Sequence, residues 1–205
     1  MRKFFSRLFS GKQEATTREE LSLSDMMSFL ETKVFPCSEC GHFFQLDKPE
    51  PLSVSNCSKC GAGNFVPKKV GPFWLYCFLG DGGMSRVYKA TCSLVPGVEY
   101  AIKILPPGQR GNQELEVLLQ REAEMTALFN GHENSITVVE FDIDEDIAYL
   151  ATEYISGRTL DHYIEEGHSQ KNMISILLQL SSIIEFIFSK GYLYRDLKPQ
   201  NIIIN

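Results

Sequence analysis

The 205-residue sequence lacks an apolar run long enough to cross a bilayer, and it lacks an excess of positive charge. A membrane-spanning helix needs about 20 predominantly apolar residues, whereas the most apolar segment, residues 173–188, is interrupted by polar residues and predicts a buried helix of a soluble protein. The net charge of −6 argues against a general nucleic-acid-binding protein, which would be basic. The amino terminus also lacks the apolar core of a signal peptide. We therefore expect a cytoplasmic protein that binds no nucleic acid.

Residues 1–32 are expected to form a basic tail and linker. Four apolar residues would share one face of a helix, with lysine and arginine around them: Phe4, Phe5, Leu8 and Phe9. Such a segment can lie on an anionic membrane surface, and a solvated tail explains the same pattern. Weak membrane contact and a solvated tail therefore both remain open.

Four of the six cysteines form two Cys-x2-Cys pairs separated by sixteen residues, a spacing typical of zinc sites. The predicted ligands are Cys37, Cys40, Cys57 and Cys60. Four thiolates complete a tetrahedral shell and leave no position for water, so the site would be structural. Two disulfides are the rival interpretation, which a reducing cytoplasm disfavours. We predict a zinc ribbon over residues 33–70 with short strands at 42–46 and 64–66, and we expect Cys77 and Cys92 to be buried.

A glycine-rich turn joins two strand-like segments, residues 73–79 and 85–90. Its glycines, Gly80, Gly82 and Gly83, let backbone amides approach the oxygens of a triphosphate without an intervening side chain. A glycine-rich hairpin alone is a weak indication. Its position between two strands nevertheless differs from the dinucleotide-binding fingerprint, in which the loop opens a helix.

A third apolar strand, residues 100–105, contains a single lysine, Lys103. Residues 113–129 have helical periodicity, and Glu122 lies in the middle of their apolar stripe. Burying a carboxylate without a cationic partner is costly. We therefore predict an ion pair between Lys103 and Glu122 rather than a lysine that points into water.

The chain continues with a predicted hairpin, residues 136–143 and 147–154, and a helix over residues 169–190. Residues 194–201, Tyr-Arg-Asp-Leu-Lys-Pro-Gln-Asn, then place three polar groups in one loop. In phosphoryl transfer an aspartate accepts the proton of the attacking hydroxyl, an asparagine holds Mg²⁺, and a cation lies near the transferred group. The pattern favours this chemistry.

Taken in order, the glycine-rich turn, Lys103, Glu122, residues 153–154 and the loop at 194–201 resemble the bacterial eukaryotic-type serine/threonine protein kinases. The resemblance covers residues 72–205. It implies an α+β fold in which an antiparallel sheet and one helix form an N-lobe, residues 71–155. The first part of a helical C-lobe, residues 156–205, would follow, with ATP bound between the lobes.

The resemblance also implies the roles of individual residues. Asp196 would be the catalytic base, Lys198 would assist transfer, and Asn201 would bind Mg²⁺. Thr152 would be the gatekeeper, and the backbones of its neighbours Glu153 and Ile155 would bind adenine. The complete set expected to contact ATP is Gly80, Gly82, Gly83, Val87, Ala101, Lys103, Glu122, Thr152, Glu153 and Ile155. The sequence Asp-Leu-Lys-Pro implies that the substrates are serine and threonine residues of proteins.

The sequence departs from the family at its end. Kinases of this type place a magnesium-binding Asp-Phe-Gly motif about a dozen residues after the catalytic-loop asparagine, whereas residues 202–205 alone follow Asn201 here. We therefore expect the 205-residue chain by itself to be a truncated, inactive kinase. A non-catalytic binding protein that joins a zinc ribbon to a degenerate kinase lobe remains an alternative, as does a small-molecule phosphotransferase of related fold. The intact Lys103, Glu122 and Asp196 favour a kinase.

Overall fold

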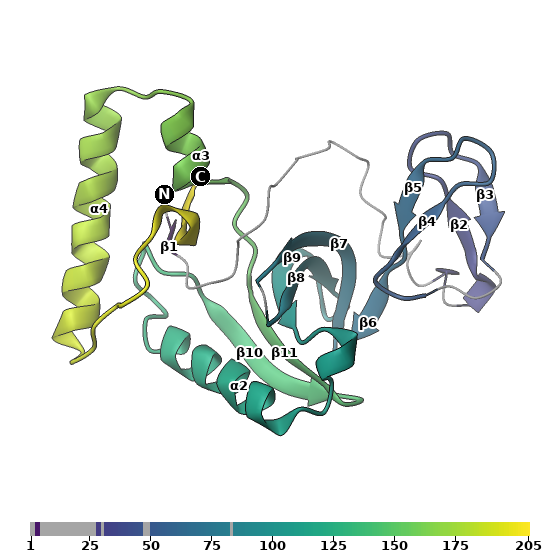
Figure 1. Cartoon of the computed structure of the whole chain (residues 1–205), viewed down its shortest axis with the longest axis horizontal. Coiled ribbons are helices and arrows are strands. Elements are labelled where there is room, and N and C mark those ends of the chain that lie inside the picture. The colour runs from purple at the N-terminus through teal and green to yellow at the C-terminus, as the bar shows by residue number, and fades with distance from the viewer. Residues whose placement is uncertain (1–2, 5–27, 30, 47–49, 83) are drawn as a thin grey trace.

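The computed structural model describes residues 3–4, 28–29, 31–46, 50–82 and 84–205, which run from a small cysteine-containing module at one end to a long helix at the other (Figure 1). The strands are β1 (Lys3–Phe4), β2 (Val34–Pro36), β3 (Phe43–Gln45), β4 (Val54–Asn56), β5 (Gly63–Phe65), β6 (Lys68–Val70), β7 (Phe73–Asp81), β8 (Arg86–Cys92), β9 (Val95–Ile104), β10 (Val138–Asp144), β11 (Ile147–Glu153), β12 (Arg158–Thr159) and β13 (Ile202–Ile204). The helices are η1 (Pro107–Gln109), α2 (Gln113–Ala127), α3 (Leu160–Glu165), α4 (Gln170–Ser189) and η2 (Pro199–Asn201).

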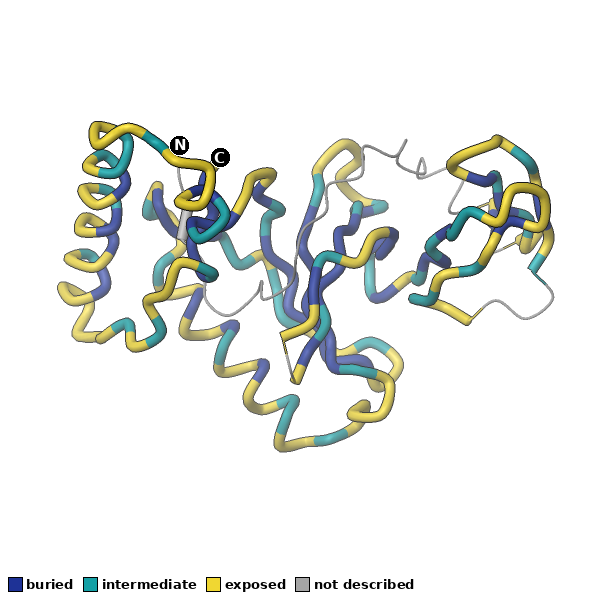
Figure 2. Tube along the Cα trace, turned by 45° about the horizontal axis from the view of Figure 1, so that its top comes forward, coloured by how far each residue is buried: buried dark blue, intermediate teal, exposed yellow. Residues whose placement is uncertain are grey.

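A six-stranded antiparallel sheet in the order β10-β11-β9-β8-β7-β6 forms the centre of the molecule. The sheet is curled, because the ring of Phe73 in β7 lies 5.1 Å from that of Tyr100 in β9 and 5.9 Å from that of Tyr149 in β11. Strand β7 is not a neighbour of β9 or of β11 in the sheet. One face therefore wraps around its own apolar side chains, and the buried segments gather there (Figure 2).

Helix α2 covers part of the opposite face of the sheet. It begins at Asn112, whose side-chain oxygen accepts hydrogen bonds from the amides of Glu114 and Leu115, so two of the amides left unpaired at the first turn are satisfied. Leu119 and Ala123 then pack against β11 in one buried cluster. The antiparallel sheet with one helix agrees with the predicted fold class.

The cysteine-containing module consists of two hairpins, β2–β3 and β4–β5. Phe29, Phe35 and Phe44 form its small core together with two of the cysteines and Val66. The module continues directly into the six-stranded sheet through β6, which pairs with β7, and Leu52 and Phe65 pack against the main apolar cluster. The sheet therefore begins at β6, three residues before the predicted boundary at residue 71.

The expectation that Cys77 and Cys92 are both buried is wrong for Cys77. Cys92 is buried in β8, but Cys77 in β7 is exposed. The pairing of β7 with β8 shifts register between Leu75 and Cys77, which marks a β-bulge. Because a bulge adds one residue to a strand, it changes the face to which the following side chains point.

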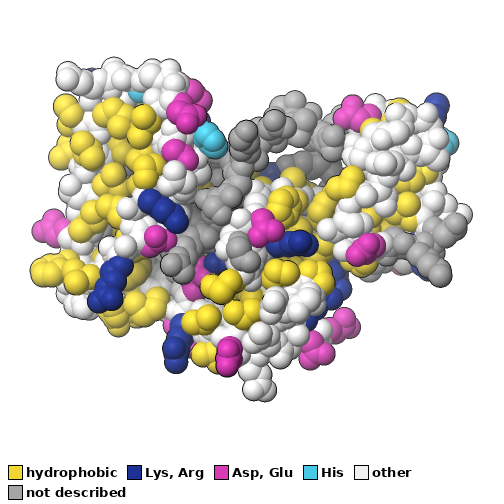
Figure 3. Space-filling view, viewed as in Figure 1, with side chains coloured by type: hydrophobic (Ala, Val, Ile, Leu, Met, Phe, Trp, Pro, Cys, Tyr) yellow, Lys and Arg dark blue, Asp and Glu magenta, His cyan; other side chains and the backbone are white. Residues whose placement is uncertain are grey.

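Helix α4 begins at Ser169, whose hydroxyl accepts a hydrogen bond from the amide of Asn172. Only one face of α4 is buried, the face that carries Ile176, Leu180, Ile183 and Ile187. The prediction of a buried helix is therefore wrong for the rest of its surface, where apolar side chains gather in the open (Figure 3). The most exposed are Ile174, Leu177, Leu178 and Phe188. Contrary to the expectation from the sequence that no segment is long and apolar enough to cross a bilayer, α4 is so by length and composition alone.

A three-stranded sheet in the order β1-β13-β12 lies beside α3 and α4. In it β1 pairs antiparallel with β13, with Lys3 opposite Ile203. The two ends of the chain therefore lie close together (Figure 1). Of the rest of the predicted tail, residues 28–29 and 31–32 are described, and Phe29 packs in the core of the cysteine-containing module instead of belonging to a free linker. The remaining residues of the tail lie outside the described residues.

Candidate active site

A cavity of about 500 Å³ opens between the glycine-rich turn, α2, α4 and the loop that follows α4. Five polar residues predicted to act in phosphoryl transfer line it: Lys103, Glu122, Asp196, Lys198 and Asn201. They come from a strand, a helix and a loop that are separate in the sequence. The fold therefore brings the predicted catalytic residues into one space.

The predicted ion pair between Lys103 and Glu122 is confirmed. The ammonium nitrogen of Lys103 in β9 lies 2.7 Å from Oε1 and 2.6 Å from Oε2 of Glu122 in α2. Lys103 is only 4% exposed, so its charge is largely removed from water and needs the carboxylate. Helix α2 supplies that carboxylate because Glu122 lies between Leu119 and Ala123, by which the helix contacts the sheet.

The loop after α4 folds back on itself around Asn201, which is 2% exposed. The Asn201 amide nitrogen donates to the backbone oxygen of Asp196 at 2.9 Å and to its Oδ2 at 3.0 Å. The ammonium of Lys198 lies 3.7 Å from the same Oδ2. Both Asn201 bonds use the amide nitrogen, so they leave its amide oxygen, a good ligand for hard cations, available. A proton acceptor, a cation and a potential metal ligand thus occupy one loop.

The glycine-rich turn closes one side of the cavity. Gly82 donates its amide to the backbone oxygen of Ser85 at 2.8 Å, and Gly82 and Ser85 both line the cavity. Gly80 lies just before the turn, opposite Val87 in the pairing of β7 with β8. Gly83 lies outside the described residues.

The residues predicted to surround adenine lie next to β9 but do not line the cavity. Val87, Ala101 and Ile155 share one buried cluster. Thr152 is fully buried, and its hydroxyl donates to the backbone oxygen of Ala101 at 3.3 Å. The Glu153 carboxylate accepts the backbone amide of Thr137, which ties the end of β11 to the strand beside it.

The apolar lining of the cavity was not predicted. Leu118 and Met125 of α2 face Ile183 and Ile187 of α4 across it, and Tyr192 lies beside them. The spacing of four residues between Ile183 and Ile187 signals one helical face. Nothing in the sequence identifies the element that this face meets.

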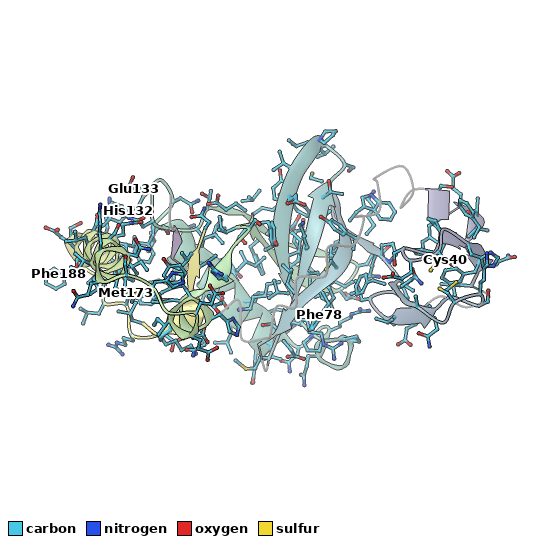
Figure 4. The ribbon with its side chains drawn as sticks, turned by 90° about the horizontal axis from the view of Figure 1, so that it is seen from above. Cys40, Phe78, His132, Glu133, Met173 and Phe188 are labelled. Atoms are coloured by element: carbon cyan, nitrogen blue, oxygen red, sulfur yellow. The ribbon has the colours of Figure 1, made fainter. Side chains whose placement is uncertain are left out.

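The four predicted zinc ligands form a cluster at the far end of the molecule from α4, where Cys40 lies among other sulfur atoms (Figure 4). All four sulfur atoms lie within 4.8 Å of one another. The separation is 3.5 Å for Cys37 and Cys60 and 3.8 Å for Cys40 and Cys57. Zinc–sulfur bonds of about 2.3 Å in a tetrahedron place the sulfurs roughly 3.8 Å apart. None of these four cysteines forms a disulfide, and the arrangement of their sulfur atoms fits a tetrahedral metal ion.

The cysteine cluster is organised by its surroundings. Asn64 is buried in β5, the strand that follows the second Cys-x2-Cys turn. Its side chain reaches the first turn, where it donates to Cys37 Sγ at 3.7 Å and accepts from the Ser38 amide at 2.9 Å, so it links the two turns. Desolvation acts to raise the pKa of the Cys37 thiol, but hydrogen bonds, chiefly from the backbones of Cys40 and Glu39, outweigh it and lower that pKa to about 6. A backbone hydrogen bond from Ala62 acts to lower the pKa of the Cys60 thiol, but contacts with the other three sulfurs and burial outweigh it and raise that pKa to about 12. The four thiols therefore hinder one another's ionisation, and a bound cation would relieve this repulsion.

Comparison with known proteins agrees with this geometry. The protein kinase domain family matches residues 75–205. A probable serine/threonine-protein kinase of Clostridium perfringens is 35% identical over 129 residues, which are 62% of this chain and 18% of that protein. The serine/threonine-protein kinase PrkC of Bacillus subtilis is 31% identical over 137 residues, which are 66% of this chain and 21% of that protein. The chain thus spans about a fifth of the length of these curated relatives.

Solved structures share the fold. The kinase domain of PknI from Mycobacterium tuberculosis superposes with a TM-score of 0.54 at 21% identity, over 66% of this chain and 56% of that one. An apo form of PpkA superposes with a TM-score of 0.59 at 26% identity, over 67% of this chain and 56% of that one. The superposed residues thus make up a little over half of each solved chain.

Proposed function

Because this chain belongs to the protein kinase family, we propose that it transfers the γ-phosphoryl group of ATP to serine and threonine hydroxyls of protein substrates. One observation carries the proposal. The Lys103–Glu122 ion pair and the Asp196–Asn201 loop line a single cavity. Such transfer depends mainly on positioning and on neutralising charge, and these residues supply both.

We assign ATP to the side of the cavity formed by the glycine-rich turn. The backbone around Gly80, Gly82 and Gly83 would bind phosphate oxygens, and Lys103, held by Glu122, would pair with the α- and β-phosphates. Adenine would lie against the buried cluster, bordered by Val87, Ala101 and Thr152 and bonded to the backbones of Glu153 and Ile155.

In the transfer step, Asp196 would accept the proton of the substrate hydroxyl, and Lys198 would stabilise negative charge on the transferred group. The Asn201 amide oxygen would hold Mg²⁺, which neutralises the phosphates when it is bound. Asn201 also orients Asp196 through its two hydrogen bonds. One buried amide would thus serve both the metal and the base.

The 205-residue segment alone is proposed to turn over poorly, since it contains no Asp-Phe-Gly after Asn201. Removing one preorganised electrostatic group costs on the order of 10²–10³ in rate. A non-catalytic binding protein is the alternative. The preserved ion pair and catalytic loop favour the enzyme, because binding alone does not require Asp196.

We also propose that Cys37, Cys40, Cys57 and Cys60 hold a structural zinc ion. The support is the fit of the sulfur positions to a tetrahedron. Because four thiolates fill the shell, the ion would stabilise the hairpins rather than take part in phosphoryl transfer. A cytoplasmic location, weak membrane contact by residues 1–32 and the absence of nucleic-acid binding remain predictions from the sequence.

The test uses a version of this chain extended through an Asp-Phe-Gly motif and the rest of a kinase C-lobe, called the full-length protein below. It measures phosphoryl transfer from labelled ATP to a mixed protein substrate, followed by phosphoamino-acid analysis. Label is expected on serine and threonine. Asp196→Asn should lower the rate by about 10²–10⁴, the usual contribution of a general base. Asp146→Asn, the same change at an exposed turn far from the cavity, should leave the rate unchanged. Transfer that does not depend on Asp196, or label on small molecules only, contradicts the proposal.

A further inference from the structure

Four side chains outside the catalytic groups converge on the face of the sheet that carries Lys103. The Lys89 ammonium in β8 lies 2.6 Å from Glu99 Oε1 in β9, and Tyr76 of β7 donates its hydroxyl to the same oxygen at 3.1 Å. The ammonium also lies over the ring of Tyr154, 4.6 Å from its centroid. Three strands and the segment after β11 thus meet at one cation.

The location of this group follows from strand register. Lys89 pairs with Ala101, and Val87, two residues earlier, pairs with Lys103. Alternate residues of a strand share a face, so Lys89 lies beside the residues assigned to adenine. The bulge between Leu75 and Cys77 inserts Tyr76 into β7, and bulges commonly redirect a side chain. Here the redirected hydroxyl bonds Glu99.

Lys89 is held in place by the need to compensate its buried charge, unlike a lysine at the surface. Its side chain is 11% exposed, whereas that of Glu99 is 39% exposed. A buried ammonium must be compensated, and a carboxylate at 2.6 Å together with the face of an aromatic ring provides this compensation. Glu99 also accepts the Tyr154 amide on its backbone oxygen at 3.2 Å. Tyr154 is thus held through both its backbone and its ring.

Tyr154 lies between Glu153 and Ile155, whose backbones are proposed to bind adenine. We propose that Lys89, braced by Glu99 and Tyr76, is a positioning residue that holds residues 153–155 at the height and angle required by the adenine base. The inference rests on the proposed function, since it assumes that this segment binds a nucleotide. It adds a determinant of nucleotide affinity that lies outside the phosphate-binding and catalytic groups.

This role predicts an effect confined to the adenine side. Without the ammonium, the Tyr154 ring loses this cation contact, and residues 153–155 gain freedom that ATP binding must remove. Lys103, Glu122 and Asp196 keep their contacts. The KM for ATP should therefore rise while kcat changes little, and a ligand that carries phosphates but no base should bind as before.

The experiment uses the full-length protein and measures the Kd for Mg-ADP and for Mg-tripolyphosphate by calorimetry, together with KM and kcat for ATP. Lys89→Met should weaken ADP binding about five- to tenfold, in line with a desolvated cation–π contact, and leave tripolyphosphate binding and kcat within about twofold. Lys89→Arg, which keeps the cation, should restore ADP affinity. Lys69→Met, the same change at an exposed position of β6, should match the wild type.

Unchanged ADP affinity in folded Lys89→Met overturns the inference and leaves the proposed function standing. Equal weakening of ADP and tripolyphosphate also overturns it, since that result indicates general loosening of the lobe. If Lys89→Met does not fold, Tyr154→Leu removes the same contact from the other side, and unchanged ADP affinity there is equally decisive. A wild-type protein that binds no ADP refutes the proposed function itself, and the inference with it.

Discussion

Gly71 lies in the turn between β6 and β7, where the chain from the cysteine-containing module enters the sheet. Replacing it with alanine should destabilise the protein by more than the cost of its backbone conformation alone. Its φ is +55°, and a Cβ atom would lie 2.5 Å from Tyr149 Oη and 3.0 Å from Cζ. Tyr149 cannot easily retreat, because it is 1% exposed, its ring packs on Phe73 and its hydroxyl donates to Glu140. The Gly71 amide also donates to Asp144 Oδ2 at 2.7 Å.

The magnitude follows from two effects. A side chain in the left-handed region costs about 1–2 kcal/mol, and an added methyl in a packed interior about 1–3 kcal/mol. Gly71→Ala should therefore lose roughly 2–5 kcal/mol of unfolding free energy. Gly97→Ala is a matched control, because Gly97 has a φ of +82° but nothing within 4 Å of the added Cβ. It should lose the backbone contribution alone, about 1–2 kcal/mol.

Urea unfolding measures the difference. The chain has a single tryptophan, Trp74, which is buried in β7 close to Gly71, so its fluorescence reports on this junction. With an m-value of about 2 kcal/mol/M, midway in the range for small proteins in urea, Gly71→Ala should unfold roughly 0.5–1.5 M earlier than Gly97→Ala. Equal midpoints for the two variants would refute the reasoning, because they would show that Tyr149 yields to the new methyl group.

Three further outcomes are expected. Lys103→Met in the full-length protein should lower phosphoryl transfer by about 10²–10³ with the fold retained by circular dichroism, and near-normal transfer would remove Lys103 from the phosphate site. Metal analysis should find one zinc per chain, and Cys40→Ser should release it and unfold the β2–β5 hairpins, as judged by proteolysis; a metal-free, protease-resistant wild type would contradict the zinc site. Leu178→Lys and Phe188→Lys, on the exposed apolar face of α4, should reduce self-association of the isolated 205-residue segment in light scattering, whereas no change would show that this face does not drive association.

Local chemistry was readable from the sequence wherever the interacting groups are close along the chain. Asp196, Lys198 and Asn201 lie within six consecutive residues of one loop, so their spacing alone brings the three groups together. The same holds for each Cys-x2-Cys turn, which closes through Gly41 and Gly61 at positive φ. The helical stripe of α2 identified Glu122 as a carboxylate that faces the core, and the need to neutralise it identified Lys103.

Contacts between distant segments were decided by strand register and packing, which no local pattern encodes. One inserted residue at Tyr76 placed Cys77 on the exposed face and brought a hydroxyl onto Glu99, because side chains alternate along a strand and a bulge shifts that alternation. The Lys89 cluster, the continuation of the cysteine module into the sheet through β6, and the apolar wall between α2 and α4 all depend on which surfaces meet. The sequence by itself predicted the type of chemistry and most of the groups that are proposed to perform it. Only the tertiary structure decided which other side chains hold those groups in place, since that depends on long-range contacts formed together as the core packs.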